Sequence, residues 1–162
     1  MIKGEKMDIK ILTINDPKEK SIYAENILRK LPEWFGNEKG LTEFIKGVQD
    51  SPFFAAIDHN DGCIGFFSIK HHYHHTGDIY VCGILPEDQK KGIGKKLFAY
   101  TEKYFKQNGR KCIIVKTLSE IVNYEPYIRT QLFYKSVGFE PLITLTEMWD
   151  EENPCLIMIK IV

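Results

Sequence analysis

The chain has 162 residues, with 22 Lys and Arg against 22 Asp and Glu, so its formal net charge is zero when the histidines are neutral. This length fits one ordinary domain, and we predict a single domain over residues 1–162. Zero net charge excludes the broad basic footprint needed to bind nucleic acid or an anionic membrane. The 43% of hydrophobic residues can form a real core and excludes a disordered chain.

The sequence carries no sign of export, and its cysteine spacing does not suggest a metal site. The N-terminal residues lack the apolar segment of a signal peptide, and no apolar run approaches the roughly 20 residues of a membrane span. We therefore expect a cytoplasmic protein without membrane contact. The cysteines are widely spaced and form no C-x-x-C pair, which favours buried thiols over disulfides or a zinc site: Cys63, Cys82, Cys112 and Cys155.

The first half of the chain alternates strand and helix signals. A first strand is predicted at Ile9–Ile14. Asp16 can cap a helix that follows it and ends near Pro32, because Pro17 suits the first helical position. Residues 31–40 read as a loop, and residues 41–48 as a shorter helix. Two strands are then predicted at 53–57 and 63–70, joined by the hairpin signal Asn60-Asp61-Gly62.

The second half reads as alternating strands and helices that end in two strands. An apolar strand is predicted at Asp78–Leu85, after the turn HHYHHTG. The elements predicted after it are a helix at about 92–108, a strand at 112–118, a helix at about 127–136, a strand from 139 and a last strand at 156–161. The order β-α-α-β-β-β-α-β-α-β-β predicts an α/β chain.

The turn before the 92–108 helix predicts an anion site. Gly92 and Gly94 open the helix with four lysines around them, at positions 90, 91, 95 and 96. A helix N-terminus exposes unpaired N–H groups, and glycine lets the backbone approach a ligand, so pyrophosphate is the natural occupant. The Gly-Lys-Ser/Thr ending of a Walker loop is missing. The alternative is a helix start with incidental glycines, although each costs about 1 kcal/mol relative to Ala.

Two motifs resemble those of a known family. Gln89-x-x-Gly92-x-Gly94, after Ile84-Leu85-Pro86, is similar to the Gln/Arg-x-x-Gly-x-Gly/Ala motif of the GNAT superfamily of acyl-CoA-dependent N-acetyltransferases. The segment from Phe133 to Phe139 resembles the family's Tyr-x-x-x-Gly-Phe segment. The resemblance implies a mixed, mostly antiparallel sheet of about seven strands, flanked by about four helices. A splayed parallel strand pair would bind acetyl-CoA.

The resemblance also assigns residues to the cosubstrate. The backbone of Cys82, Gly83 and Ile84 would pair with the pantetheine arm, and these residues would also belong to the core. The residues that would wrap the pyrophosphate are Gln89, Lys90, Lys91, Gly92, Ile93, Gly94 and Lys95. Tyr127 stands where the family has a helical Asn, and its hydroxyl could substitute for that side chain.

Acetyl transfer from a thioester needs a neutral amine and a proton for the departing thiolate. The motif makes Tyr134 the candidate general acid, since a phenol with an ordinary pKa of about 10 suits a thiolate leaving group. Asp78 matches a base of the family's histone-acetylating branch and would act through water. Lys116 lies where another branch, acting on ribosomal protein N-termini, has a Glu. The alternatives are a packed tyrosine and a solvated strand-end carboxylate.

Two further segments are candidates for the acceptor side. His71, His72, His74 and His75 bracket Tyr73 in the turn before Asp78. This turn could bind a metal, line the substrate pocket with a proton relay from His72, or form a solvated hairpin tip. Trp34 could form an aromatic wall over the amine or anchor the core.

These features predict an acetyl-CoA-dependent N-acetyltransferase that works by direct transfer in a ternary complex, without a metal. A neutral surface favours a small-molecule amine as acceptor. The alternatives are a protein or peptide amine acetyltransferase and a noncatalytic acyl-CoA sensor. A strand edge near the C-terminus could support a homodimer.

Overall fold

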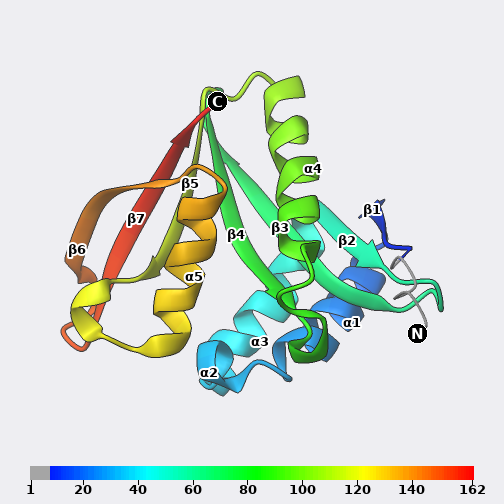
Figure 1. Ribbon diagram of the computed structural model, residues 1–162, viewed down its shortest axis with the longest axis horizontal. Helices are drawn as coiled ribbons and strands as arrows, with labels where there is room; N and C mark the ends of the chain where they lie inside the picture. The colour runs from blue at the N-terminus through cyan, green and yellow to red at the C-terminus, as the bar shows by residue number, and fades with distance from the viewer. Residues whose placement is uncertain (1–7) are drawn as a thin grey trace, which may run out of the picture. The chain divides into compact units, whose positions relative to one another are not determined.

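The computed structural model describes residues 8–162, so the predictions for the first seven residues lie outside the described chain. One seven-stranded sheet has the order β1-β2-β3-β4-β5-β7-β6 (Figure 1). The strands are β1 (Lys10–Ile14), β2 (Phe53–Ile57), β3 (Cys63–His72), β4 (Thr76–Ile84), β5 (Cys112–Leu118), β6 (Glu140–Asp150) and β7 (Asn153–Ile161). The α-helices are α1 (Pro17–Leu28), α2 (Pro32–Phe35), α3 (Glu38–Gly47), α4 (Ile93–Gln107) and α5 (Glu125–Ser136).

The predicted fold class is confirmed, with one more helix than expected in the described chain. The sheet is mixed, since β4 and β5 run parallel while β1 with β2, β2 with β3, β5 with β7, and β6 with β7 are antiparallel. Among the helices of residues 8–162, none combines the length and apolarity needed to cross a bilayer.

The chain divides into two compact units. The first contains the chain up to Ser68 together with Val81–Thr101. Its core forms around β2, whose five residues are all buried, and the Phe53 ring stacks on that of Phe66 with centroids 4.7 Å apart. Asp16 caps α1 as predicted, accepting a hydrogen bond from the Lys18 amide at 3.4 Å.

The predicted loop at residues 31–40 is largely helical. Its first part forms α2, and α3 begins at Glu38 rather than at position 41. Asn37 explains the earlier start, because its side chain accepts a hydrogen bond from the Gly40 amide at 2.9 Å and so caps the helix. A capping residue inside a segment rich in turn-forming residues is easily read as part of a loop.

The second unit consists of Ile69–Tyr80 and Glu102–Val162. Its parallel pairing covers Thr76–Ile79 of β4 and Cys112–Val115 of β5. Helix α5 packs on β5, where the Gln131 side-chain amide donates to the Leu118 carbonyl at 2.6 Å. Strands β6 and β7 form the outer hairpin of this unit (Figure 1).

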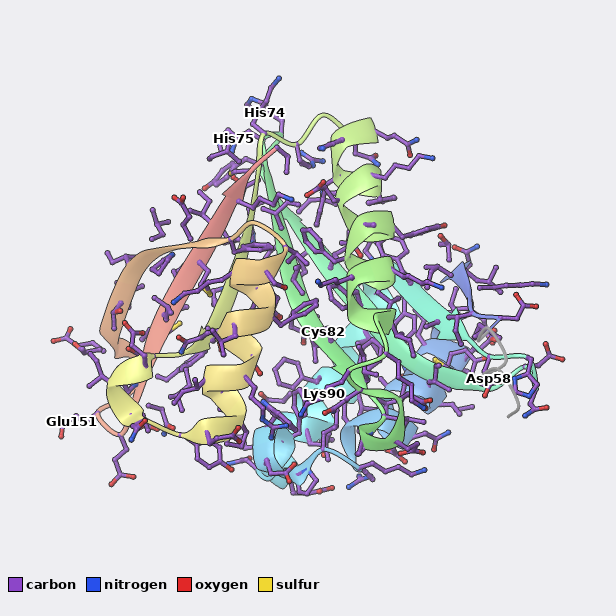
Figure 2. The ribbon with its side chains drawn as sticks, viewed as in Figure 1. Asp58, His74, His75, Cys82, Lys90 and Glu151 are labelled. Carbon is purple, nitrogen blue, oxygen red and sulfur yellow. The ribbon has the colours of Figure 1, made fainter. Side chains whose placement is uncertain are left out.

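The strands of the second unit are longer than predicted. β3 continues to His72 and β4 begins at Thr76, which leaves only residues 73–75 in the turn. Tyr73 makes this tight turn in the left-handed region, with φ of 56°, and is 87% exposed. The last strand begins at Asn153 rather than at position 156. Figure 2 shows His74 and His75 on the β3–β4 turn and Glu151 at the tip of the β6–β7 hairpin.

Gly77 lets α4 pack directly on β4 in the second unit. A Cβ atom built at Gly77 would lie 2.5 Å from Cε1 of Phe105, a distance that no side chain tolerates. The Phe105 ring therefore covers this face of the strand. Because successive side chains of a strand point to opposite faces, Asp78 is directed to the other face.

Candidate active site

The turn between β4 and α4 has the backbone of an anion-binding loop. Lys90 and Gly92 both lie in the left-handed region, with φ of 61° and 82° (Figure 2 labels Lys90). A Cβ at Gly92 would meet nothing within 4 Å, so its backbone angle, and not lack of space, favours glycine there. The Lys96 amide makes the first α-helical bond, to the Gly92 carbonyl at 3.2 Å. The backbone N–H groups of residues 93–95 precede this first α-helical bond, so they can donate hydrogen bonds to an anion.

Gln89, the first residue of the motif, holds this turn against the end of β4. Its side-chain amide donates to the Ile84 carbonyl at 3.0 Å, and its backbone amide bonds to the Pro86 carbonyl. One side-chain N–H and the backbone N–H of Gln89 are thus used within the protein, which ties the turn to the end of β4.

The end of β4 packs closely on α1 within the first unit. A Cβ at Gly83 would lie 3.0–3.3 Å from the side chains of Leu31, Ile27 and Leu28. Cys82, Gly83 and Ile84 are only partly buried, and the Leu85 amide bonds to the Ile64 carbonyl at 2.9 Å. The strand end expected to meet the pantetheine arm is therefore both core and partly open (Figure 2 labels Cys82).

Asp78 is the centre of a polar cluster in the second unit. Its side chain is only 5% exposed, and Oδ2 accepts hydrogen bonds from His72 Nε2 at 2.7 Å and from Lys116 Nζ at 3.3 Å. The interpretation of Asp78 as a solvated strand-end carboxylate is wrong, because the strand pairing that buries the residue also supplies its two partners. Asp78 pairs with Ile114 in register, and Lys116 lies two residues further along the same face.

Tyr134 is buried in the second unit at 4% exposure. Its ring meets that of Phe139 edge-on, with centroids 5.4 Å apart, and the Phe139 amide bonds to the Tyr134 carbonyl at 3.0 Å. Gly138 makes the reversal with φ of 104°, and a Cβ there would lie 2.9 Å from the Lys160 side chain. The Tyr-x-x-x-Gly-Phe motif thus fixes the tyrosine ring at the end of α5.

Tyr127, on the first turn of α5, also belongs to the second unit. Burial raises the pKa of its phenol, and the neighbouring Tyr124 adds to the shift. Tyr127 therefore remains a neutral hydroxyl that can donate a hydrogen bond. This is the property required if it replaces the amide of the family's Asn.

The histidine turn does not converge on one point. Arg110 Nε donates to His71 Nδ1 at 2.8 Å, while His75 Nδ1 meets the Thr76 hydroxyl at 2.6 Å and His72 faces Asp78. Within residues 8–162, no group of three or more His, Cys, Asp or Glu residues could hold a metal ion.

Trp34 lies in the first unit, on the short helix α2, and is partly buried. Its neighbour Phe35 packs edge-on against Phe44 of α3, with centroids 5.8 Å apart. Phe35 therefore attaches this helix to α3. The role of Trp34 at the acceptor amine stays a prediction.

Two charged residues were not predicted as part of the cluster. Lys116 was considered only as the residue at a position where another branch of the family has a Glu base, a role that a charged lysine cannot play, and Arg110 was not considered. Strand alternation would predict that Lys116 lies beside Asp78, but only once β4 and β5 are known to run parallel in this register. Arg110 follows Gly109 after α4, and no local pattern links it to His71.

The comparisons with known proteins agree with this geometry. A sequence model of the acetyltransferase (GNAT) domain matches residues 49–141. A search of curated proteins finds no match. The chain belongs to the GNAT acetyltransferase family.

Solved structures share its fold at low sequence identity. A GNAT-family protein from Desulfovibrio desulfuricans superposes with a TM-score of 0.82 at 15% identity, covering 94% of this chain and 98% of its own. A GNAT acetyltransferase from Elizabethkingia anophelis with acetyl-CoA bound has a TM-score of 0.74 at 13% identity, with coverages of 97% and 100%. An aminoglycoside 6'-N-acetyltransferase complexed with coenzyme A has a TM-score of 0.72 at 20% identity, with coverages of 96% and 97%.

The partly buried His71 predicts a loss of stability in acid. Burial lowers the pKa of His71 from its ordinary value of 6.5, helped by the charges of Arg110 and His72. The unfolded chain then binds the proton more tightly, so the free energy of unfolding falls as the pH drops from about 7 to about 5. We expect His71→Gln, which cannot ionise, to show a shallower fall in urea titrations across this range. Equal slopes for both proteins would contradict this prediction.

Proposed function

We propose that this protein transfers an acetyl group from acetyl-CoA to a primary amine of a small molecule, by direct attack in a ternary complex. The observation that carries the proposal is the turn from Gln89 to Gly94, where two left-handed residues precede free amides at the start of α4. Lys90, Lys91 and Lys95 add positive charge at this turn. Such a turn matches the charge and the acceptor oxygens of a pyrophosphate.

The proposed reaction gives each group of residues a separate role. In the first unit, backbone groups of Cys82, Gly83 and Ile84 hold the pantetheine arm as an added strand would, and strand N–H groups polarise the thioester carbonyl. In the second unit, the Asp78 cluster removes a proton from the amine and Tyr134 supplies one to the thiolate. The Tyr127 hydroxyl is proposed to hydrogen-bond the cosubstrate.

A small molecule is favoured as acceptor because the zero net charge offers no general attraction to basic protein tails. One structural neighbour is an aminoglycoside acetyltransferase, which shows that this fold serves such acceptors. Trp34 and His72 are the residues proposed to contact the amine. The rival functions are acetylation of a protein or peptide amine and noncatalytic acyl-CoA sensing, and a screen of amines by thiol release distinguishes all three. The cytoplasmic location stays a prediction.

Gly92→Ala should weaken CoA binding about tenfold, because the left-handed angle that presents the turn is disfavoured for Ala. The matched control is Gly109→Ala, since Gly109 lies beyond the other end of α4 with φ of 76° and equally open space. Calorimetric titration with CoA should show reduced affinity for the first variant alone. An unchanged affinity of Gly92→Ala, in a variant as stable as the control, would count against the phosphate turn.

Tyr134→Phe should lower kcat about 100-fold while leaving CoA affinity nearly unchanged, because it removes only the proton donor. The ring packing against Phe139 is retained in this variant, so its melting temperature serves as the folding control. Thiol release with a reactive amine measures kcat, and titration with CoA measures the affinity for CoA. Wild-type activity in the variant would refute the acid role of Tyr134 while leaving the acetyltransferase function in place.

We also propose that strand β6 pairs with a second copy of the chain. β6 is one of the two edge strands of the sheet, and four of its large apolar side chains are about half exposed: Leu142, Ile143, Met148 and Trp149. It contains no Lys or Arg, although it carries Pro141 and three carboxylates, which also oppose edge pairing. A two-fold axis can pair the strand with its own copy.

Placing a lysine on this edge should dissociate the dimer. In sedimentation experiments we expect the wild type to be dimeric and Ile143→Lys to be monomeric. Leu132→Lys, on the exposed surface of α5, makes the same chemical change away from the edge and should remain dimeric. A wild type that sediments as a monomer at all concentrations would exclude the proposed pairing.

A further inference from the structure

We infer that His72 is the catalytic base, acting through Nδ1, and that Asp78 is a positioning residue that orients its ring. This inference rests on the proposed function and names the atom that takes the proton from the acceptor amine. Lys116 is assigned a second role, as the cation that limits how strongly the pair holds a proton. The three side chains come from the parts of β3, β4 and β5 that belong to the second unit.

Asp78 is poorly placed to meet an amine itself. Its side chain is 5% exposed, and Oδ2 already accepts two hydrogen bonds, from His72 and Lys116. An amine would have to displace one of these donors and enter a buried position. A buried carboxylate with cationic and N–H donors is well suited to fix a neighbour, as in a catalytic triad.

His72 has the exposure that Asp78 lacks. Its side chain is 41% exposed, and the 2.7 Å contact to the carboxylate occupies Nε2. Since a carboxylate only accepts, Nε2 carries the hydrogen, and in the neutral imidazole Nδ1 then keeps its lone pair. In residues 8–162, Nδ1 makes no hydrogen bond. The arrangement therefore presents one oriented basic nitrogen at the surface of the second unit.

The carboxylate beside His72 also faces a cation. Lys116 Nζ lies 3.3 Å from the same carboxylate oxygen, so it offsets part of the negative charge that faces His72. Arg110 bonds instead to the adjacent His71, from Nε to Nδ1 at 2.8 Å. The His72 side chain is 41% exposed, so solvent is at hand to accept the proton it takes.

The proposed step balances atoms and charge. The amine arrives as an alkylammonium, and His72 Nδ1 takes one proton and passes it to solvent. The nitrogen lone pair attacks the thioester carbonyl, so that an N–C bond forms and the C–S bond breaks. Tyr134 gives its proton to the departing thiolate, and the second proton lost by the nitrogen restores the phenol. The products are an amide, free CoA thiol and one proton in solvent.

The first experiment measures kcat/KM against pH by thiol release, using the intact chain, acetyl-CoA and an amine found in the screen. His72→Gln should lower the rate about 100-fold and abolish the acidic limb of the profile, and Asp78→Asn should lower it about tenfold. The matched control is His74→Gln, an exposed histidine of the same turn, which should keep the wild-type profile. Added imidazole should restore part of the activity of His72→Ala, which a merely structural role would not allow.

Lys116→Met provides an independent test, in which the direction of a pH shift is measured. Without the cation beside Asp78, the imidazolium is better stabilised, so the acidic limb should move to higher pH. A limb that stays in place or moves to lower pH would contradict the role given to Lys116.

The outcomes separate the inference from the function on which it rests. If the wild type acetylates no amine, the proposed function fails. If the wild type is active and His72→Gln keeps its rate and profile, the His72 assignment fails while the function stands. Nitrogen-15 spectra of the histidine rings add a test that needs no turnover. They should show His72 with hydrogen on Nε2 and a bare Nδ1, and the opposite tautomer would overturn the inference.

Discussion

The parallel pairing of β4 with β5 is the constraint on which the rest of the second unit depends. Its register sets Asp78 opposite Ile114 and brings Lys116 onto the same face. The neighbouring Gly77 lets Phe105 close the opposite face, which leaves Asp78 directed away from α4. A shift of one residue would turn Asp78 toward Phe105, where a buried carboxylate would have no donor. The polar cluster therefore follows from strand register.

The shape of the Gln89–Gly94 turn in the first unit follows from a different constraint, the backbone angles at Lys90 and Gly92. Left-handed residues in this spacing reverse the chain before α4 and leave its first amides free. The Gln89 side chain ties the turn to the end of β4, so the loop is held in shape before any ligand arrives. A preformed site binds without the cost of ordering a loop.

The sequence predicted most of the fold, but not the contacts that the proposed site residues make. Strands with continuous apolar runs and the capped helix α1 were predicted well, because local patterns determine them. Helix α2 and the early start of α3 were missed, since an Asn cap within a turn-rich segment has two interpretations. The contact of Lys116 with Asp78 requires a strand register that joins residues 38 positions apart, and the use of the Gln89 side chain inside the protein has no local signal.

The central claim is that the Gln89–Gly94 turn and the first amides of α4 hold the pyrophosphate of acetyl-CoA. The most direct measurement is a titration of nitrogen-15-labelled protein with CoA, followed by amide spectra. The account predicts that the amides of Gly92, Ile93, Gly94 and Lys95 shift most, and that inorganic pyrophosphate shifts the same group more weakly. Saturation with CoA that leaves these amides unmoved would contradict it.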